Sequence, residues 1–206
     1  MTELFLSAFV TLFVVIDPPG CAPIYAGLTA NATPAARRSM ALRACLIAGI
    51  ILVGFALFGE DLLNAMHIEL DAFRIAGGIM LFLIALEMVF EKRTERREDR
   101  AEKLKGDPEY EDVSVFPMAM PMLAGPGAIA SIMLLTGEAT GMEGTLVVLG
   151  ALAAVLLLTM LALMAASPLM KVFGAKVEAV ITRLLGVLLA ALASQYVIDG
   201  LRNSFS

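Results

Sequence analysis

Six apolar stretches of about 20 residues constrain the fold of this 206-residue chain more than any other feature. A helix of about 20 apolar residues crosses a bilayer core of about 30 Å. With 59% hydrophobic residues and a mean hydropathy of +0.85, the chain is too apolar for a soluble domain. We therefore predict an all-α integral membrane protein, a single polytopic domain over residues 1–206. Its six transmembrane helices are placed at residues 4–28, 41–58, 70–90, 115–135, 145–166 and 179–198.

The basic residues between these stretches predict the orientation in the membrane. Arg37 and Arg38 follow the first stretch, seven Lys and Arg residues follow the third, and Lys171 and Lys176 follow the fifth. Eleven of the fifteen basic residues thus lie on one side, which the positive-inside rule places in the cytoplasm. With an even number of crossings, both termini are expected outside.

An Asp17-Pro18-Pro19-Gly20 sequence interrupts the first apolar stretch near its middle. Proline lacks a backbone N–H and clashes with the preceding turn, so a continuous helix is not expected here. Within a bilayer, broken backbone persists only inside protein or beside a water-filled cavity, and an ionisable residue at this depth suggests a functional site. Asp17 could alternatively be only a helix cap that closes a structural kink.

The two halves of the chain show a faint internal similarity. A second Pro-Gly interruption, Ala124-Gly125-Pro126-Gly127, lies in the fourth stretch, and an Arg-x-x-Gly sequence occurs in both the third and the sixth stretch. Three crossings per half require the second half to be inverted relative to the first. We predict two inverted three-helix repeats, residues 1–90 and 115–206, joined by a charged cytoplasmic linker, residues 91–114. Pro/Gly-interrupted segments at corresponding positions of inverted halves indicate a transporter binding site.

The two breaks are expected to bring two helix N-termini together near the middle of the membrane. Free N–H groups at a helix N-terminus attract a carboxylate, whereas an ionised Asp17 and free carbonyls suit an ammonium group or a cation. The pattern predicts a site for a small zwitterion, with H⁺ or Na⁺ as a coupling ion and no other cofactor. The predicted substrate-binding residues are Asp17, Pro19, Gly20, Gly125, Pro126, Gly127 and Gln195.

Three charged residues near the ends of the third and sixth stretches are candidates for gating or for an entrance. Arg74 and Arg183 lie about one turn inside their helices on opposite sides, and Glu87 lies near the cytoplasmic end of the third. The alternative is structural, because an arginine can extend its head group to the interface or pair within the protein. The linker, residues 91–112, is expected to continue the third helix as a solvated extension and then become flexible, with a docking site for a partner as the alternative.

The sequence lacks the motifs of several functional classes. It contains no phosphate-binding loop, no nucleophile elbow, no dinucleotide fingerprint and no His/Cys metal cluster, so we expect no enzyme, no bound metal and no nucleic-acid partner. Transport would therefore depend on an ion or substrate gradient. A homo-oligomer is left open, because small residues occur on many helix faces.

A set of motifs spans essentially the whole chain: Asp17-Pro-Pro-Gly20 with Pro23, Arg74-x-Ala-Gly-Gly78, Pro117-x3-Pro121, Ala124-Gly-Pro-Gly-Ala-Ile129, Arg183-x2-Gly186, Gln195 and Gly200. Together they resemble the MarC family of six-span inner-membrane proteins of bacteria and archaea, also grouped as neutral amino acid transporters. The resemblance implies a six-helix fold, a cytoplasmic (inner) membrane location, and movement of small neutral amino acids such as glycine or alanine. Two alternatives stay open, a carrier or flippase for another metabolite or a lipid-linked substrate, and a non-transporting membrane assembly protein.

Overall fold

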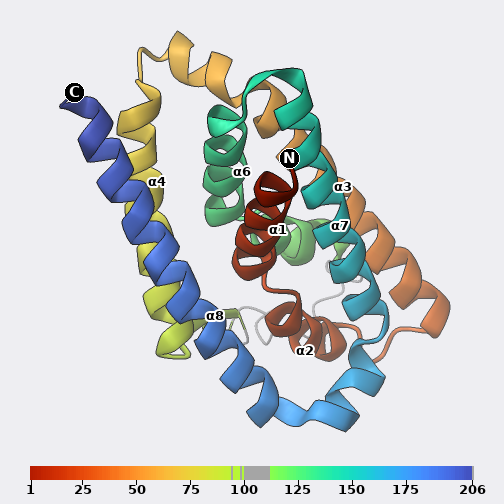
Figure 1. The fold of residues 1–206 in the computed structure, drawn as a ribbon. Helices are drawn as coiled ribbons and strands as arrows, with labels where there is room; N and C mark the ends of the chain where they lie inside the picture. Colours follow the sequence, from red (N-terminus) through yellow and green to blue (C-terminus); the bar gives the residue numbers. More distant parts are fainter. Residues whose placement is uncertain (94, 98, 100–111, 206) are drawn as a thin grey trace.

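The computed structural model describes residues 1–93, 95–97, 99 and 112–205, without the side chains of residues 167–176 and 178. All its regular structure is helical (Figure 1). The elements are α1 Thr2–Ile16, α2 Pro18–Leu28, α3 Pro34–Ala65, α4 Leu70–Val89, the π-helical segment η2 Ser114–Leu123, α6 Pro126–Glu138, α7 Gly141–Met164 and α8 Ala166–Ser204.

The predicted all-α membrane fold is confirmed. Five spans, Thr2–Leu28, Pro34–Ala65, Leu70–Val89, Gly141–Met164 and Ala179–Ser204, are long and apolar enough to cross a bilayer. The pair η2 and α6, bent by 54°, makes a sixth broken span. Figure 1 shows both termini toward the upper end of the molecule, while the start of α3 and the end of α4 lie toward the lower end. This arrangement agrees with an even number of crossings.

Two connections differ from the prediction. Lys171 and Lys176 lie between the fifth and sixth predicted stretches, but α8 begins at Ala166 and its backbone is helical through that connection. Composition marks the end of an apolar stretch and not the end of a helix, because polar residues such as lysine are compatible with helical backbone. The second helix is also longer than residues 41–58, because Pro34 and the side chain of Thr33 form an N-terminal cap well before the apolar part.

Helix α4 packs antiparallel against the C-terminal part of α8, and the two form one side of the molecule (Figure 1). A Cβ at Gly78 would lie 2.9 Å from the Ala193 carbonyl oxygen, and one at Gly186 would lie 3.1 Å from the Ala85 carbonyl oxygen. The glycines let the two backbones approach closely, as in other membrane helix pairs. The third and sixth predicted spans thus run antiparallel, as inverted repeats require. The internal repeat itself stays a prediction.

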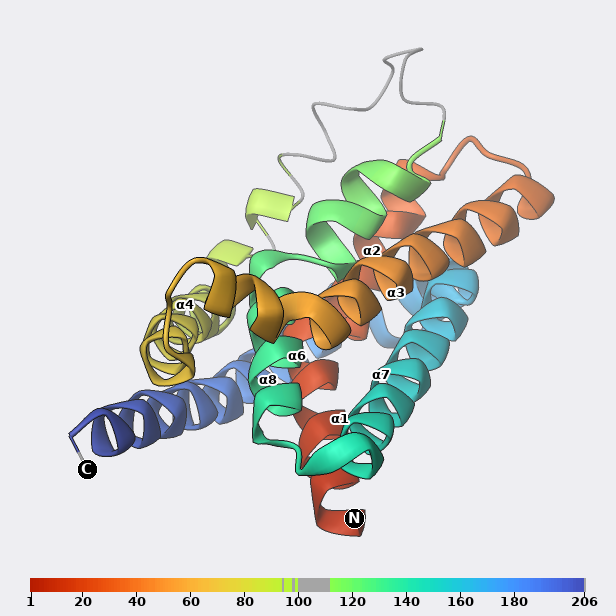
Figure 2. The ribbon, with the colours of Figure 1, turned by 90° about the horizontal axis from the view of Figure 1, so that it is seen from above.

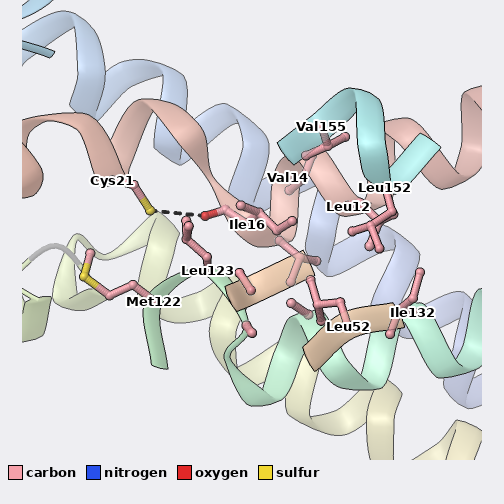
Figure 3. Packing of buried hydrophobic residues seen from close by; sticks show 14 of the residues in the cluster. Leu12, Val14, Ile16, Cys21, Leu52, Met122, Leu123, Ile132, Leu152 and Val155 are labelled. Carbon is pink, nitrogen blue, oxygen red and sulfur yellow. Dashed lines mark hydrogen bonds between the residues drawn. The ribbon is translucent and has the colours of Figure 1, made fainter. Parts of the chain in front are cut away.

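Helices α1 and α6 lie between this pair and the α3–α7 pair on the other side, as Figures 1 and 2 agree. Apolar side chains from α1, α3, α6 and α7 form the core there, directly beside the first break (Figure 3). Among them are Leu12, Ile16, Leu52, Ile132, Leu152 and Val155, all buried. The core therefore fixes the two broken spans relative to each other.

The glycine contact between α4 and α8 gives a first prediction. We expect Gly78→Ala to lower the free energy of unfolding by about 1–2 kcal/mol, because the methyl group would meet Val197 and the backbone of α8. The measurement is thermal or denaturant unfolding of the detergent-solubilised protein. Gly54→Ala is the matched control, since nothing lies within 4 Å of its Cβ, and we expect no loss of stability there. Equal midpoints for the two variants would contradict close α4–α8 packing.

Candidate functional site at the two helix breaks

Asp17 forms the first break. Helix α1 ends at Ile16, α2 begins at Pro18, and Asp17 between them has left-handed backbone angles, φ 59° and ψ 64°. Its Oδ1 accepts a hydrogen bond from the Gly20 N–H at 3.1 Å, so the predicted capping of the restarting helix is confirmed. Gly20 is required by space, because a Cβ there would lie 2.3 Å from the Asp17 carboxylate.

The two prolines leave carbonyl groups of α1 without their helical donors. In a continuous helix Val15 would bond to the N–H of residue 19, which a proline lacks. Arg93 replaces this donor, since its Nη2 lies 2.7 Å from the Val15 carbonyl oxygen. The Cys21 thiol donates to the next carbonyl, that of Ile16, at 3.4 Å (Figure 3). An arginine far along the chain thus completes the hydrogen bonding of the break.

Arg97 pairs with the carboxylate that caps α2. Its guanidinium Nη1 lies 3.1 Å from Asp17 Oδ2, and the two side chains are only 11% and 1% exposed. Burial, helped by the neighbouring Arg97 charge, lowers the pKa of Arg93 to about 10, which leaves Arg93 cationic at neutral pH. The break therefore contains one buried carboxylate facing two cations.

The segment after α4 accordingly differs from the predicted solvated extension. Glu91 has a left-handed backbone, φ 60°, which ends α4 and turns the following helical residues back onto the protein. The sequence reasoning missed Arg93 and Arg97, whose four-residue spacing places them on one helical face and was the available signal. Of the rest of the predicted linker, residues 94, 98 and 100–111 lie outside the described residues, and its docking role stays untested.

The second break is less regular than a bent helix. Segment η2 has extended backbone angles at Phe116 and Met120, each preceding a proline, and a proline disfavours helical angles in the residue before it. Helix α6 then begins at Pro126, as predicted. A Cβ at Gly125 would lie 2.4 Å from the Pro121 carbonyl oxygen, so only glycine fits there.

The two breaks meet. A Cβ on Gly127 would lie 3.3 Å from Val15 Cγ1 and 2.6 Å from Ile84 Cδ1, which places the start of α6 against the end of α1 and against α4. Beside this contact lies a cavity of about 270 Å³. Its lining residues are Val15, Ile84, Glu87, Arg93, Arg96, Arg97, Pro121, Met122, Gly125, Pro126, Gly127 and Ala128. We refer to it as the break cavity.

The break cavity gathers most, but not all, of the predicted site residues. Gly125, Pro126, Gly127 and Glu87 line it directly, and Asp17 with Gly20 adjoins it through Arg97. Pro19 is half-buried in the first turn of α2 and does not line it. Gln195 is not brought there, because it is exposed on α8 and donates to Asp199 one turn further along the same helix at 2.9 Å.

The three predicted gating residues are all held in ion pairs. Buried Arg74 lies 2.6 Å from Asp71 and 3.4 Å from Glu138. Half-exposed Arg183 pairs with Glu91. Both arginines therefore pair within the protein, as the structural alternative to gating expected. A gating role stays a prediction.

The third predicted gating residue, Glu87, pairs with Arg96 at the edge of the break cavity. Together with Arg93 and Arg97, the lining carries three cations against one carboxylate, and the N-terminus of α6 adds free N–H groups. The cavity can therefore accept a negatively charged group, while Asp17 behind Arg97 can accept a positive one. Among the described residues, no group of three or more His, Cys, Asp or Glu side chains could hold a metal ion.

Comparison with known proteins gives one consistent result. A family model described as "MarC family integral membrane protein" matches residues 2–205. A UPF0056 membrane protein of Methanocaldococcus jannaschii is 33% identical over 202 residues, 98% of each chain. YvbG of Bacillus subtilis is 33% identical over 205 residues, covering 100% of this chain and 97% of YvbG. The UPF0056 inner membrane protein YhgN of Escherichia coli is 32% identical over 200 residues, covering 96% and 95%. No solved structure matches.

The replacement of a missing backbone donor by Arg93 gives a second prediction. Arg93→Met should lower the free energy of unfolding by about 1–3 kcal/mol, because the Val15 carbonyl would be left buried without a donor. Lys92→Met, at the exposed neighbouring position, is the control and should change stability by less than about 0.5 kcal/mol. Both are measured by denaturant unfolding in detergent. Equal stability of the two variants would show that Arg93 does not complete the break.

Proposed function

The chain belongs to the MarC family of integral membrane proteins, and from its break cavity we propose a secondary transporter of small neutral amino acids such as glycine and alanine. The observation that carries the proposal is the meeting of two interrupted spans around a cavity lined by cations and a helix N-terminus, with the buried Asp17 carboxylate behind Arg97. A zwitterion needs both kinds of group within a short distance. At about 270 Å³ the cavity is smaller than typical drug-sized pockets, which supports a small substrate.

Coupling to a gradient of H⁺ or Na⁺ is part of the proposal. Asp17 is the only carboxylate among the described residues whose side chain is fully buried, so any exchange of its cationic partner occurs away from bulk water. A buried carboxylate that can exchange one cation for another is a typical element of ion-coupled carriers. We further propose a cytoplasmic membrane location with both termini outside, so that Arg93 and Arg97 approach the break cavity from the cytoplasm.

One observation favours a second candidate, a carrier or flippase of a lipid-linked substrate. An almost wholly apolar groove of about 640 Å³ runs between α3 and α7, and none of its lining residues lines the break cavity. Gly49, Gly54 and Ala153 contribute to its concave shape. Thermal stabilisation by lipid-linked ligands, with none by glycine or alanine, would favour this candidate over the first.

The transport proposal predicts a specific loss in proteoliposomes. Wild-type protein should take up labelled glycine and alanine under an inward H⁺ or Na⁺ gradient, and Asp17→Asn should reduce uptake at least about tenfold, because a neutral amide binds an ammonium group more weakly than a carboxylate does. Asp61→Asn, an exposed carboxylate at the end of α3, is the control with unchanged uptake. Uptake that stays at the level of empty liposomes under every gradient would exclude the proposal.

The proposed orientation predicts which residues a membrane-impermeant maleimide reaches in intact cells. In a Cys21→Ala, Cys45→Ala background, which removes both buried thiols, Phe205→Cys should be labelled from outside. Lys92→Cys, also at an exposed position, should be labelled only after the membrane is permeabilised. The reverse pattern would place the termini in the cytoplasm.

A further inference from the structure

Arg97 differs from the other two arginines of the break cavity in what its guanidinium does. Arg93 replaces a backbone donor at Val15 and also contacts the Met88 sulfur at 3.0 Å, so its role is to complete the break. The Arg96 side chain is 71% exposed and pairs with Glu87. Arg97 is nearly buried, lines the cavity and pairs with a buried carboxylate that caps the restarting helix.

The Asp17–Arg97 pair is the only ion pair among the described residues in which both side chains are at least 89% buried. Removing one member of such a pair is strongly unfavourable, because the other charge stays buried without a partner. A ligand with a single charge could replace only one member and would leave the other unpaired. A ligand that carries both charges on groups joined by a single carbon, as an α-amino acid does, could replace both members and leave each charge paired.

We propose that Arg97 is a specificity-determining residue that binds the carboxylate of the substrate, and that the substrate inserts into the Asp17–Arg97 contact. The ammonium group of the substrate then takes the place of Arg97 at Asp17 Oδ2, and its carboxylate takes the place of Asp17 at the guanidinium. This inference rests on the proposed transport of small neutral amino acids and explains the choice of a zwitterion. The cavity beside Arg97 provides the space, and Gly125 and Gly127 line it with backbone, because neither position has room for a side chain.

The exchange leaves the first turn of α2 and the segment of Arg93 in place. Asp17 Oδ1 keeps its hydrogen bond from Gly20 whichever cation faces Oδ2, so α2 stays capped during the exchange. Arg93, one turn earlier, keeps the segment attached to Val15. Gly127 and Ala128, in the first turn of α6, line the same cavity, and the N-terminus of that helix adds to the attraction for the incoming carboxylate.

The test compares three ligands of similar size on the purified full-length protein in detergent or nanodiscs. Alanine carries both charges, propionate lacks the ammonium group and ethylamine lacks the carboxylate. Thermal shift and calorimetry should show binding of alanine and at least about tenfold weaker binding of the other two, because each leaves one buried charge unpaired. Equal binding of propionate or ethylamine to the wild type would overturn the exchange.

Variants separate this inference from the proposed function. Arg97→Gln should weaken alanine binding at least about tenfold, and Arg97→Lys should recover part of it, since lysine keeps the charge but not the forked donors. Arg43→Gln is the matched control, because Arg43 pairs with Asp112 at the surface and does not line the break cavity, and its binding should equal that of the wild type. The double variant Asp17→Asn, Arg97→Gln removes both buried charges, so it should fold and yet not bind.

The outcomes are distinct. If the wild type binds alanine and Arg97→Gln or the folded double variant binds it equally well, the assignment of Arg97 is wrong while the transport proposal stands. If the wild type binds no small amino acid and transports none, the proposed function fails and this inference fails with it.

Discussion

Two adjacent prolines in the first membrane-spanning segment remove backbone hydrogen-bond donors that lipid cannot supply. Side chains of the protein provide the missing hydrogen bonds. The Asp17 carboxylate receives the Gly20 N–H, and Arg93 and the Cys21 thiol donate to the carbonyls before the break. In water such groups would be hydrated, whereas in hydrocarbon each must find a partner in the protein. The charged segment after α4 therefore packs against the break through Arg93 and Arg97.

The arginines at the break impose a second constraint, because a buried cation needs a compensating negative charge. Asp17 provides it for Arg97, and Glu87 does so for Arg96 nearer the surface. A cation and an anion held at low dielectric attract strongly, but their desolvation offsets most of the gain. Such a pair contributes little net stability and can exchange partners with a ligand that satisfies both charges. This property links the structural role of the break to the proposed transport.

Close packing of the helices around the break cavity holds its residues in place. Gly127 allows α6 to begin against Val15, and Gly78 and Gly186 allow α4 and α8 to lie backbone to backbone. The core of α1, α3, α6 and α7 then fixes both broken spans (Figure 3). A site made from irregular backbone thus lies on rigid, closely packed helices.

The sequence by itself determined the features that depend on local composition and on proline. Six apolar segments, breaks at Asp17 and Gly125, the restart of helices at Pro18 and Pro126, and the capping by Asp17 all follow from residues that are neighbours in the chain. Only the tertiary structure decided the partners of the first break. Arg93 and Arg97 are 78 and 80 positions from the groups they contact, and the left-handed Glu91 turns their segment inward. The tertiary structure likewise turned Gln195 away from the break cavity, because the side of α8 that packs on α4 is set by glycine contacts between distant helices. A local preference specifies where a helix ends, but the charge that meets a buried carboxylate depends on the path of the whole chain.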